Sequence, residues 1–150
     1  MDRPDWTRGF PVRIGPYQLG VAEGSPETAG YWEGVDANEL RLKRCADCGQ
    51  FLHPRRIVCS MCASTELTWQ RVQGNGQIYT FSELHRAPLA ELADSVPYHV
   101  GMVQLDEGVT LFSRLFGAPG AEVRIGAPVS VEFRELEVGG KLPVFVVQPT

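Results

Sequence analysis

The sequence predicts a mainly β protein in which a small metal-binding ribbon precedes a five-stranded barrel. Three observations lead to this fold class. The chain of 150 residues has a hydrophobic fraction of 43%, which is sufficient for a globular core. From residue 74 onward, short runs of alternating apolar and polar residues are separated by turn residues, as in strands. All four cysteines lie in two C-x-x-C pairs, Cys45 with Cys48 and Cys59 with Cys62.

The cysteine pairs have the spacing of a closed metal site. Two thiolates three positions apart at a tight turn can occupy two corners of a tetrahedron, and the second pair can supply the other two. Gly49 suits a turn of positive φ just after the first pair. Disulfides would need an oxidising compartment, and we expect no secretory signal. A thioredoxin-like redox site needs a single C-x-x-C that opens a helix. We therefore expect a structural Zn²⁺ held by four thiolates, although a rubredoxin-type iron site would use the same ligands.

Residues 1–38 are expected to form an N-terminal arm and a short helix. In residues 1–24, glycine and proline alternate with five large apolar side chains, so this arm either packs on its own domain or wraps a partner. Ser25-Pro26-Glu27 is a helix-start pattern. A helix this short cannot bury both Tyr31 and Trp32 alone, so these two are candidate anchors for a partner.

Residues 39–73 are expected to form the ribbon. A strand pattern leads from Leu40 into Cys45, and Leu67–Val72 is the closing strand. The ribbon is too small to fold through its own apolar burial, so metal binding should contribute on the order of 10 kcal/mol or more. Its apolar packing is expected from Phe51, Leu52, Ile57 and Val58.

Residues 74–150 are expected to form the barrel. Five strands within about 75 residues suit a closed barrel of the oligonucleotide/oligosaccharide-binding (OB) type. Gly74-x-Gly76 enters a strand and lacks a third glycine, so it is interpreted as a turn or bulge and not as a phosphate loop. The strands are expected at Gln77–His85, Tyr98–Asp106, Val109–Phe116, Val129–Arg134 and Leu142–Val147.

Two aromatic residues of the first barrel strand allow two interpretations. Tyr79 and Phe81 are two positions apart, so their side chains point the same way in a regular strand. Such a pair could stack nucleic-acid bases. In a small barrel, however, alternating aromatics are mostly core residues, and we expect both in the core.

Composition and the lack of motifs exclude several function classes. The net charge of −4 and the lack of a basic stripe argue against nucleic acid as the main partner. The longest apolar run is Val144–Val147, far short of a membrane span. Reduced cysteines indicate a cytoplasmic protein. If the metal takes all four thiols, none remains for covalent catalysis, and the chain has no G-x-S-x-G, H-E-x-x-H or P-loop motif. We expect no catalytic residue in this chain.

The order of the motifs resembles the family of zinc-ribbon and OB-fold proteins associated with acyl-CoA metabolism. The resemblance covers roughly residues 27–148 and joins a metal motif to several barrel motifs in fixed order. One departure is Pro54-Arg55-Arg56, where the family often has Pro-Pro-Arg. The matching segments are Tyr31-Trp32, Leu40-Arg-Leu-Lys-Arg-Cys-Ala-Asp-Cys-Gly49, Pro54-Arg55-Arg56, Cys59-Ser-Met-Cys62, Leu67-Thr-Trp69, Gly74-Asn-Gly-Gln-Ile-Tyr-Thr-Phe81, His85-Arg-Ala-Pro88, Pro97-Tyr98, Leu105-Asp-Glu-Gly108, Ile125-Gly126-x-Pro128-Val129 and Leu142-Pro-Val-Phe145.

The resemblance implies a rubredoxin-like ribbon, a barrel and a non-catalytic role. Such proteins are usually small subunits beside thiolases or thiolase-like enzymes, in pathways such as aromatic or sterol side-chain degradation or archaeal isoprenoid synthesis. Their barrel can help to hold the CoA part of the substrate. CoA carries several phosphate charges, so the candidate contacts here are Arg55, Arg56, His85 and Arg86.

Two other functions remain open from the sequence. A ribbon followed by an OB barrel also suits a single-stranded nucleic-acid-binding protein, although the acidic balance disfavours it. A stand-alone CoA-thioester enzyme is disfavoured because no nucleophile–base pair is recognisable.

Overall fold

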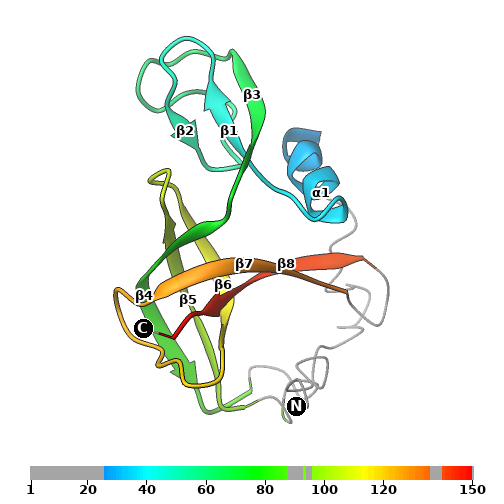
Figure 1. Cartoon of the computed structure of the whole chain (residues 1–150). Coiled ribbons are helices and arrows are strands. Elements are labelled where there is room, and N and C mark those ends of the chain that lie inside the picture. Colours follow the sequence, from blue (N-terminus) through cyan, green and yellow to red (C-terminus); the bar gives the residue numbers. More distant parts are fainter. Residues whose placement is uncertain (1–25, 88–92, 94–95, 136–139, 150) are drawn as a thin grey trace.

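The fold is a small three-stranded sheet above a closed five-stranded barrel, with a short helix beside the small sheet (Figure 1). This is a computed structural model, and it describes residues 26–87, 93, 96–135 and 140–149. The predicted fold class is confirmed: a mainly β chain with a four-cysteine ribbon, an OB barrel and one short helix. The predicted arm and the cap residue Ser25 lie outside the described residues.

The helix begins later than its cap pattern predicts. A 3-10 turn, Pro26–Thr28, precedes α1, Ala29–Asp36, and Thr28 is the N-cap without a side-chain capping bond. Glycine lowers helix propensity, yet Gly30 faces Trp69 of the ribbon so closely that a Cβ would overlap the indole. The glycine is therefore required by packing against the ribbon. Within the part of the chain that the structure describes, no helix has the length and hydrophobicity needed to cross a membrane.

The ribbon and the barrel share one hydrophobic core. The ribbon consists of β1, Leu40–Cys45, β2, Phe51–Leu52, and β3, Leu67–Val72, in the antiparallel order β2-β1-β3. Leu40 pairs with Val72 at the base of this sheet, and both are buried together with side chains from the barrel. Gly74 forms the turn from β3 into the barrel, as predicted, and its carbonyl accepts a hydrogen bond from Val131.

The prediction that Ile57 and Val58 pack inside the ribbon is wrong. The side chains of Ile57 and Val58 are 62% and 39% exposed, whereas Leu52 is buried and Phe51 packs on the shared core. The buried cluster of the ribbon consists of Cys45, Leu52 and Cys59, with Leu67 against it. The thiols fill the centre of the ribbon, so the apolar side chains that flank them face outward.

The barrel has the predicted number of strands. β6 and β8 are parallel, the other neighbours are antiparallel, and the strand order closes as β4-β5-β6-β8-β7. Its centre is filled by fully buried aliphatic and aromatic side chains, including Ile78, Val103 and Phe145. The strands are β4, Asn75–Leu84, β5, Tyr98–Leu105, β6, Thr110–Gly117, β7, Pro128–Glu135, and β8, Lys141–Val147.

The prediction that Tyr79 lies in the core is also wrong. The register of β4 against β5 shifts between Ile78 and Thr80, which marks a β-bulge at Tyr79. The extra residue breaks the alternation, so Tyr79 is 62% exposed while Phe81 packs against the core. The two rings therefore do not form a shared stacking platform.

Candidate metal centre

The four cysteines converge at the end of the ribbon. Their Sγ atoms all lie within 4.8 Å of one another. The Sγ atoms of Cys45 and Cys62 are 3.6 Å apart, and those of Cys48 and Cys59 are 3.5 Å apart. A tetrahedral zinc with Zn–S bonds of about 2.3 Å places its sulfurs about 3.8 Å from one another. The four residues therefore fit a tetrahedral metal ion with no open coordination position.

Two equivalent turns position the thiols. The backbone N–H of Gly49 donates to the carbonyl of Cys45 (2.9 Å), and that of Ala63 donates to the carbonyl of Cys59 (3.0 Å). Gly49 and Ala63 thus occupy the same place in the two turns, and both have positive φ, +78° and +61°. The glycine expected after the first pair has the conformation that the sequence predicts, but the second turn imposes it on an alanine.

Backbone hydrogen bonds favour the thiolate form at the first cysteine of each pair. Hydrogen bonding by the N–H of Cys48 lowers the pKa of the Cys45 thiol to about 6, against the opposing effect of burial. The N–H of Cys62 likewise lowers the pKa of Cys59. The thiolate is the metal-binding form of cysteine, so the folded turns prepare these ligands for the ion. When bound, Zn²⁺ in such a closed site supplies folding energy and no chemistry.

A buried lysine holds the loop that precedes the second cysteine turn. Lys43 is only 7% exposed, and its Nζ donates a 2.7 Å hydrogen bond to the carbonyl of Arg56 while lying 5.0 Å from the ring centroid of Trp69. Burial lowers the pKa of Lys43. The sequence did not indicate this burial. In β1, Lys43 points to the face of the sheet away from Leu42, and no sequence pattern shows that the loop containing Arg56 covers that face.

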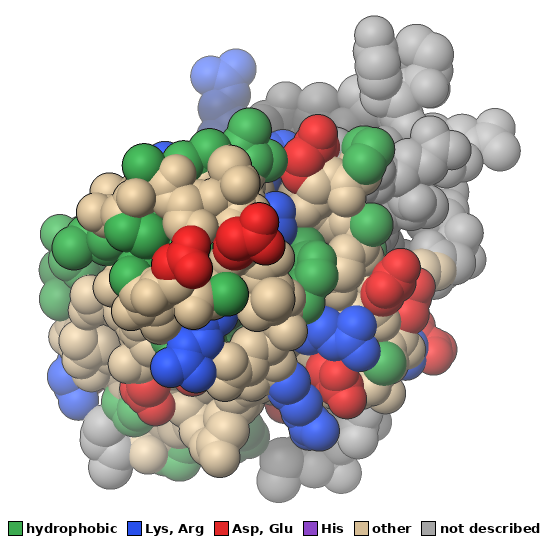
Figure 2. All heavy atoms as spheres, turned by 90° about the horizontal axis from the view of Figure 1, so that it is seen from above, with side chains coloured by type: hydrophobic (Ala, Val, Ile, Leu, Met, Phe, Trp, Pro, Cys, Tyr) green, Lys and Arg blue, Asp and Glu red, His purple; other side chains and the backbone are tan. Residues whose placement is uncertain are grey.

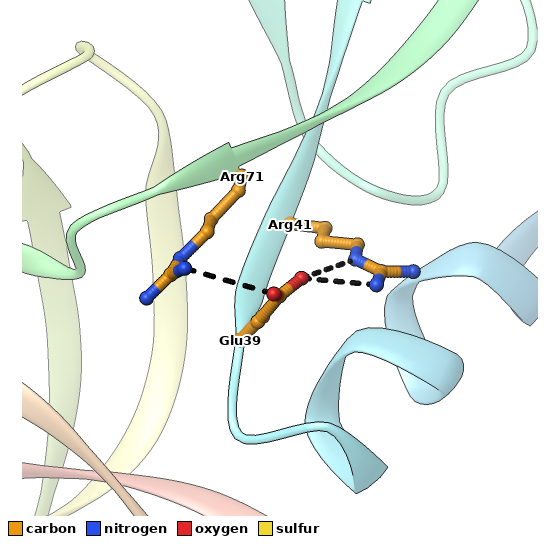
Figure 3. A network of polar contacts seen from close by, with 3 residues as sticks. All are labelled: Glu39, Arg41 and Arg71. Carbon is orange, nitrogen blue, oxygen red and sulfur yellow. Dashed lines mark hydrogen bonds and ion pairs between the residues drawn. The ribbon is translucent and has the colours of Figure 1, made fainter.

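A carboxylate bridges two strands of the ribbon, β1 and β3. The Glu39 side chain lies between two arginines (Figure 3): Oε2 accepts from Nε and Nη2 of Arg41 at 3.1 and 2.9 Å, and Oε1 lies 3.6 Å from Nη1 of Arg71. Glu39 and Arg71 line a groove of about 630 Å³ between the ribbon and the barrel, together with Glu107. The groove carries both signs of charge, so it is not a simple anion site. The three charged residues of this network form no recognisable sequence motif, so the sequence did not predict it.

The four candidate CoA contacts form two separate pairs. Arg55 and Arg56 are exposed in the ribbon loop after β2, and His85 and Arg86 are exposed just after β4. These segments lie at opposite ends of the molecule (Figure 1). His85 Nε2 is 2.9 Å from Glu83, whose other carboxylate oxygen is 3.0 Å from His99 Nε2. One phosphate group therefore cannot contact all four residues.

The two candidate anchors of α1 differ in their surroundings. Tyr31 and Trp32 make an edge-to-face contact with ring centroids 4.9 Å apart. Tyr31 packs against the shared core, and its burial raises the pKa of the phenol to about 12. Trp32 is half-buried.

Two adjoining parts of the chain match known domain families. Residues 32–68 match the family described as "ChsH2, rubredoxin-like zinc ribbon domain", and residues 69–134 match "ChsH2, C-terminal OB-fold domain". These two ranges contain the four-cysteine site, the first three strands of the barrel and all but the last residue of the fourth.

Full-length relatives include subunits of larger enzymes. The "3-oxo-4,17-pregnadiene-20-carboxyl-CoA hydratase alpha subunit" of Mycobacterium tuberculosis is 33% identical over 123 residues, which are 82% of this chain and 39% of that protein. The "Benzoylsuccinyl-CoA thiolase subunit BbsA" of Thauera aromatica is 31% identical over 82 residues, 55% of each chain. This chain spans less than two fifths of the length of the hydratase subunits that it matches, at 37% and 39%.

A solved structure agrees over most of the chain. In the structure described as "Ltp2-ChsH2(DUF35) aldolase", one chain superposes with a TM-score of 0.71 at 32% sequence identity. The match covers 83% of this chain and 96% of that one. With both domain matches and this nearly complete relative, the chain belongs to the ChsH2 (DUF35) family of zinc-ribbon and OB-fold proteins.

Proposed function

We propose that this chain is a non-catalytic, zinc-binding accessory subunit of a thiolase-like enzyme complex that acts on acyl-CoA substrates. The observation that carries this proposal is the match, over ribbon and barrel together, to nearly the whole of a chain in a ChsH2(DUF35) aldolase structure. The names of two further relatives, a CoA hydratase subunit and a CoA thiolase subunit, favour the same substrate class. In this proposal the subunit supports assembly in the cytoplasm, where thiols remain reduced. A pathway of aromatic or sterol side-chain degradation is the setting that these names favour.

The cysteines of this chain support the proposal that another subunit carries out catalysis. Its four cysteines all lie in the metal cluster, so none is available to form a thioester with an acyl group. A thiolase reaction needs a reactive cysteine, which the larger subunit would have to supply. We infer that this chain alone has no thiolysis or hydrolysis activity toward acyl-CoA.

Contact with the CoA part of the substrate is a further element of the proposal. Arg55 with Arg56, and His85 with Arg86, are each exposed and near one another in sequence, as a phosphate contact requires. Since the two pairs lie at opposite ends of the molecule (Figure 1), at most one pair contacts a given phosphate group. Removing the charges of each pair separately and measuring KM for acyl-CoA in the complex would show which pair contacts CoA.

The helix is proposed to contribute to the partner interface. Tyr31 is already largely covered by this chain's own core, so Trp32 is the better anchor of the two. Changing Tyr31 and Trp32 to alanine together should weaken the complex by several kcal/mol if they are central anchors. Trp32→Ala alone separates the interface effect from loss of core packing, and the zinc content of both variants is the folding control.

Co-expression with a thiolase-like protein encoded beside this chain tests the proposed function. We expect the two proteins to co-elute stoichiometrically on size exclusion, and the activity of the thiolase-like protein to require this chain. Turnover by this chain after removal of every trace of the partner would contradict the non-catalytic role. Failure to bind the partner, together with salt-dependent binding of a labelled single-stranded oligonucleotide, would support the nucleic-acid alternative instead.

A further inference from the structure

Exposed apolar side chains gather at the second cysteine turn. Among the described residues, six large hydrophobic side chains are exposed, and three of them lie within five positions of one another. Ile57 is 62% exposed, Val58 39% and Met61 71%. Seen from above, the ribbon end of the molecule shows hydrophobic side chains on its surface beside charged ones (Figure 2). We call residues 57–61 the knuckle tip. Concentrations of exposed apolar surface next to polar groups mark interaction sites.

The knuckle tip is held in place on both sides. Cys59 belongs to the metal cluster, its N–H donates to the carbonyl of Ser64 (2.8 Å), and its sulfur accepts from the N–H of Met61 (3.4 Å). On the other side, Lys43 holds the carbonyl of Arg56 at 2.7 Å. Anchors fixed before binding lose little conformational entropy in a complex, so such a tip is suited to docking.

The charges around the knuckle tip indicate the kind of surface that it fits. Residues 51–62 contain two arginines, Arg55 and Arg56, and no acidic residue. Both arginines are exposed and directly precede Ile57. Asp47 of the neighbouring turn accepts a hydrogen bond from Ser64. An apolar centre with arginines at its edge is complementary to an apolar pocket edged by carboxylates.

Two other kinds of partner fit less well. Nucleic acid is bound mainly through many contacts between cationic side chains and phosphates, and the tip has only two arginines on a chain of net charge −4. Stable binding to a membrane surface needs a larger apolar face or a cluster of basic residues. A protein surface is therefore the occupant that these residues favour.

We propose that the knuckle tip docks into an apolar pocket edged by carboxylates on the larger, acyl-CoA-processing subunit. This inference rests on the proposed function and assigns a docking surface distinct from Tyr31 and Trp32. In this proposal the metal ion also has a role in binding: because it fixes Cys59 and Cys62, it positions Ile57 and Met61 for contact with the partner.

Matched serine substitutions test the proposal. Ile57→Ser and Met61→Ser each remove an exposed apolar side chain from the tip. Phe112→Ser removes one of similar exposure, 69%, from β6 of the barrel. In biolayer interferometry against the purified thiolase-like protein, we expect each tip variant to raise Kd by about tenfold or more. Phe112→Ser should leave Kd within about threefold of wild type. The zinc content of every variant, measured by elemental analysis, controls for the fold.

Charge reversal gives an independent measurement. Arg55 is fully on the surface and outside the metal turn, so Arg55→Glu does not threaten the ribbon. It should slow association about tenfold at low salt, and the difference from wild type should shrink as salt is added. An unchanged association rate would overturn the assignment of a carboxylate edge.

The outcomes distinguish this proposal from the proposed function. If wild-type protein fails to bind the thiolase-like protein, the proposed function itself is wrong. If wild type binds and the zinc-loaded tip variants bind equally well, the knuckle tip is not the docking surface. Weaker binding by Phe112→Ser alone would place the interface on the barrel. Tip-dependent self-association in size exclusion with light scattering, or tip-dependent binding to phosphatidylserine vesicles, would identify a different occupant and overturn the proposal.

Discussion

The α-carbon of Gly30 packs directly against the indole of Trp69, and no space for a side chain remains between them. This contact joins α1 to β3 of the ribbon. Gly30→Ala should therefore destabilise the protein by about 1–3 kcal/mol through overpacking, although alanine raises helix propensity by up to about 1 kcal/mol. Thermal unfolding would measure the change. The exposed Ala29 provides the comparison, because Ala29→Gly changes propensity without this contact. A stabilised Gly30→Ala variant would show that α1 can move away from Trp69.

The paired turns of the metal site predict substitutions of opposite effect. Gly49 has positive φ and ordinary space for a Cβ, so Gly49→Ala should cost about 1 kcal/mol through backbone strain alone. Ala63 already has that conformation, so Ala63→Gly should be neutral or stabilising by up to about 1 kcal/mol. Thermal stability and competition with a zinc chelator would report both effects. Destabilisation by both substitutions would mean that the two turns are not equivalent.

Tyr31 predicts a late step in alkaline titration. Burial raises its pKa from 10.0 to about 12, so the neutral phenol is favoured in the folded protein. Its contribution to stability is complete below pH 10 and is lost as the pH rises from 10 toward 12. Ultraviolet absorbance of the phenolate should show a step near pH 12 that Tyr31→Phe abolishes. Tyr79→Phe, which removes an exposed phenol, should leave that step in place. A late step that survives in Tyr31→Phe would contradict the burial of this ring.

Removal of the metal should affect more than the ribbon. Purified protein is expected to contain about one zinc per chain and to be colourless, whereas a red, iron-containing preparation would contradict zinc. Because Leu40 and Val72 of the ribbon lie in the core shared with the barrel, strong chelation should abolish cooperative unfolding of the whole chain. Circular dichroism melting with and without chelator measures this. A barrel that still melts cooperatively without metal would show that the shared core is dispensable.

Acid should release the metal as well. The pKa of Cys45 is lowered to about 6, so its thiolate is stable at neutral pH, and the stabilisation is lost as the pH falls through about 6. Zinc released to a colorimetric indicator should rise as the pH decreases, because protons and the ion compete for the same thiolates. Full retention at pH 4 would show that the bound ion competes with protons far more strongly than these hydrogen bonds suggest.

The parts that sequence predicted well depend on local patterns. The cysteine spacing determines the metal site because each turn brings its own two thiols together, whatever the rest of the chain does. The barrel strands follow from alternation between turn residues, and their observed bounds differ from the predicted ones by one or two residues at most ends.

The parts that sequence missed depend on contacts between distant segments. A register shift against β5 turns Tyr79 outward, and β4 alone contains no sign of it. Ile57 and Val58 are apolar and were expected inside, but the thiols occupy the centre of the ribbon. Burial of Lys43 requires the loop of Arg56, 13 residues away, and the contact of Gly30 requires Trp69. Such pairings are properties of the assembled fold.

The parallel pairing of β6 with β8 has a consequence for biosynthesis. β8 is the strand that joins β6 to β7, so the barrel cannot close until residues up to Val147 have left the ribosome. The ribbon is complete at Val72, about 75 residues earlier. At a synthesis rate of about 5–20 residues per second, this interval lasts roughly 4–15 s. During this interval the four cysteines are already synthesised and the last strand of the barrel is not, so zinc can bind to the ribbon before the barrel closes.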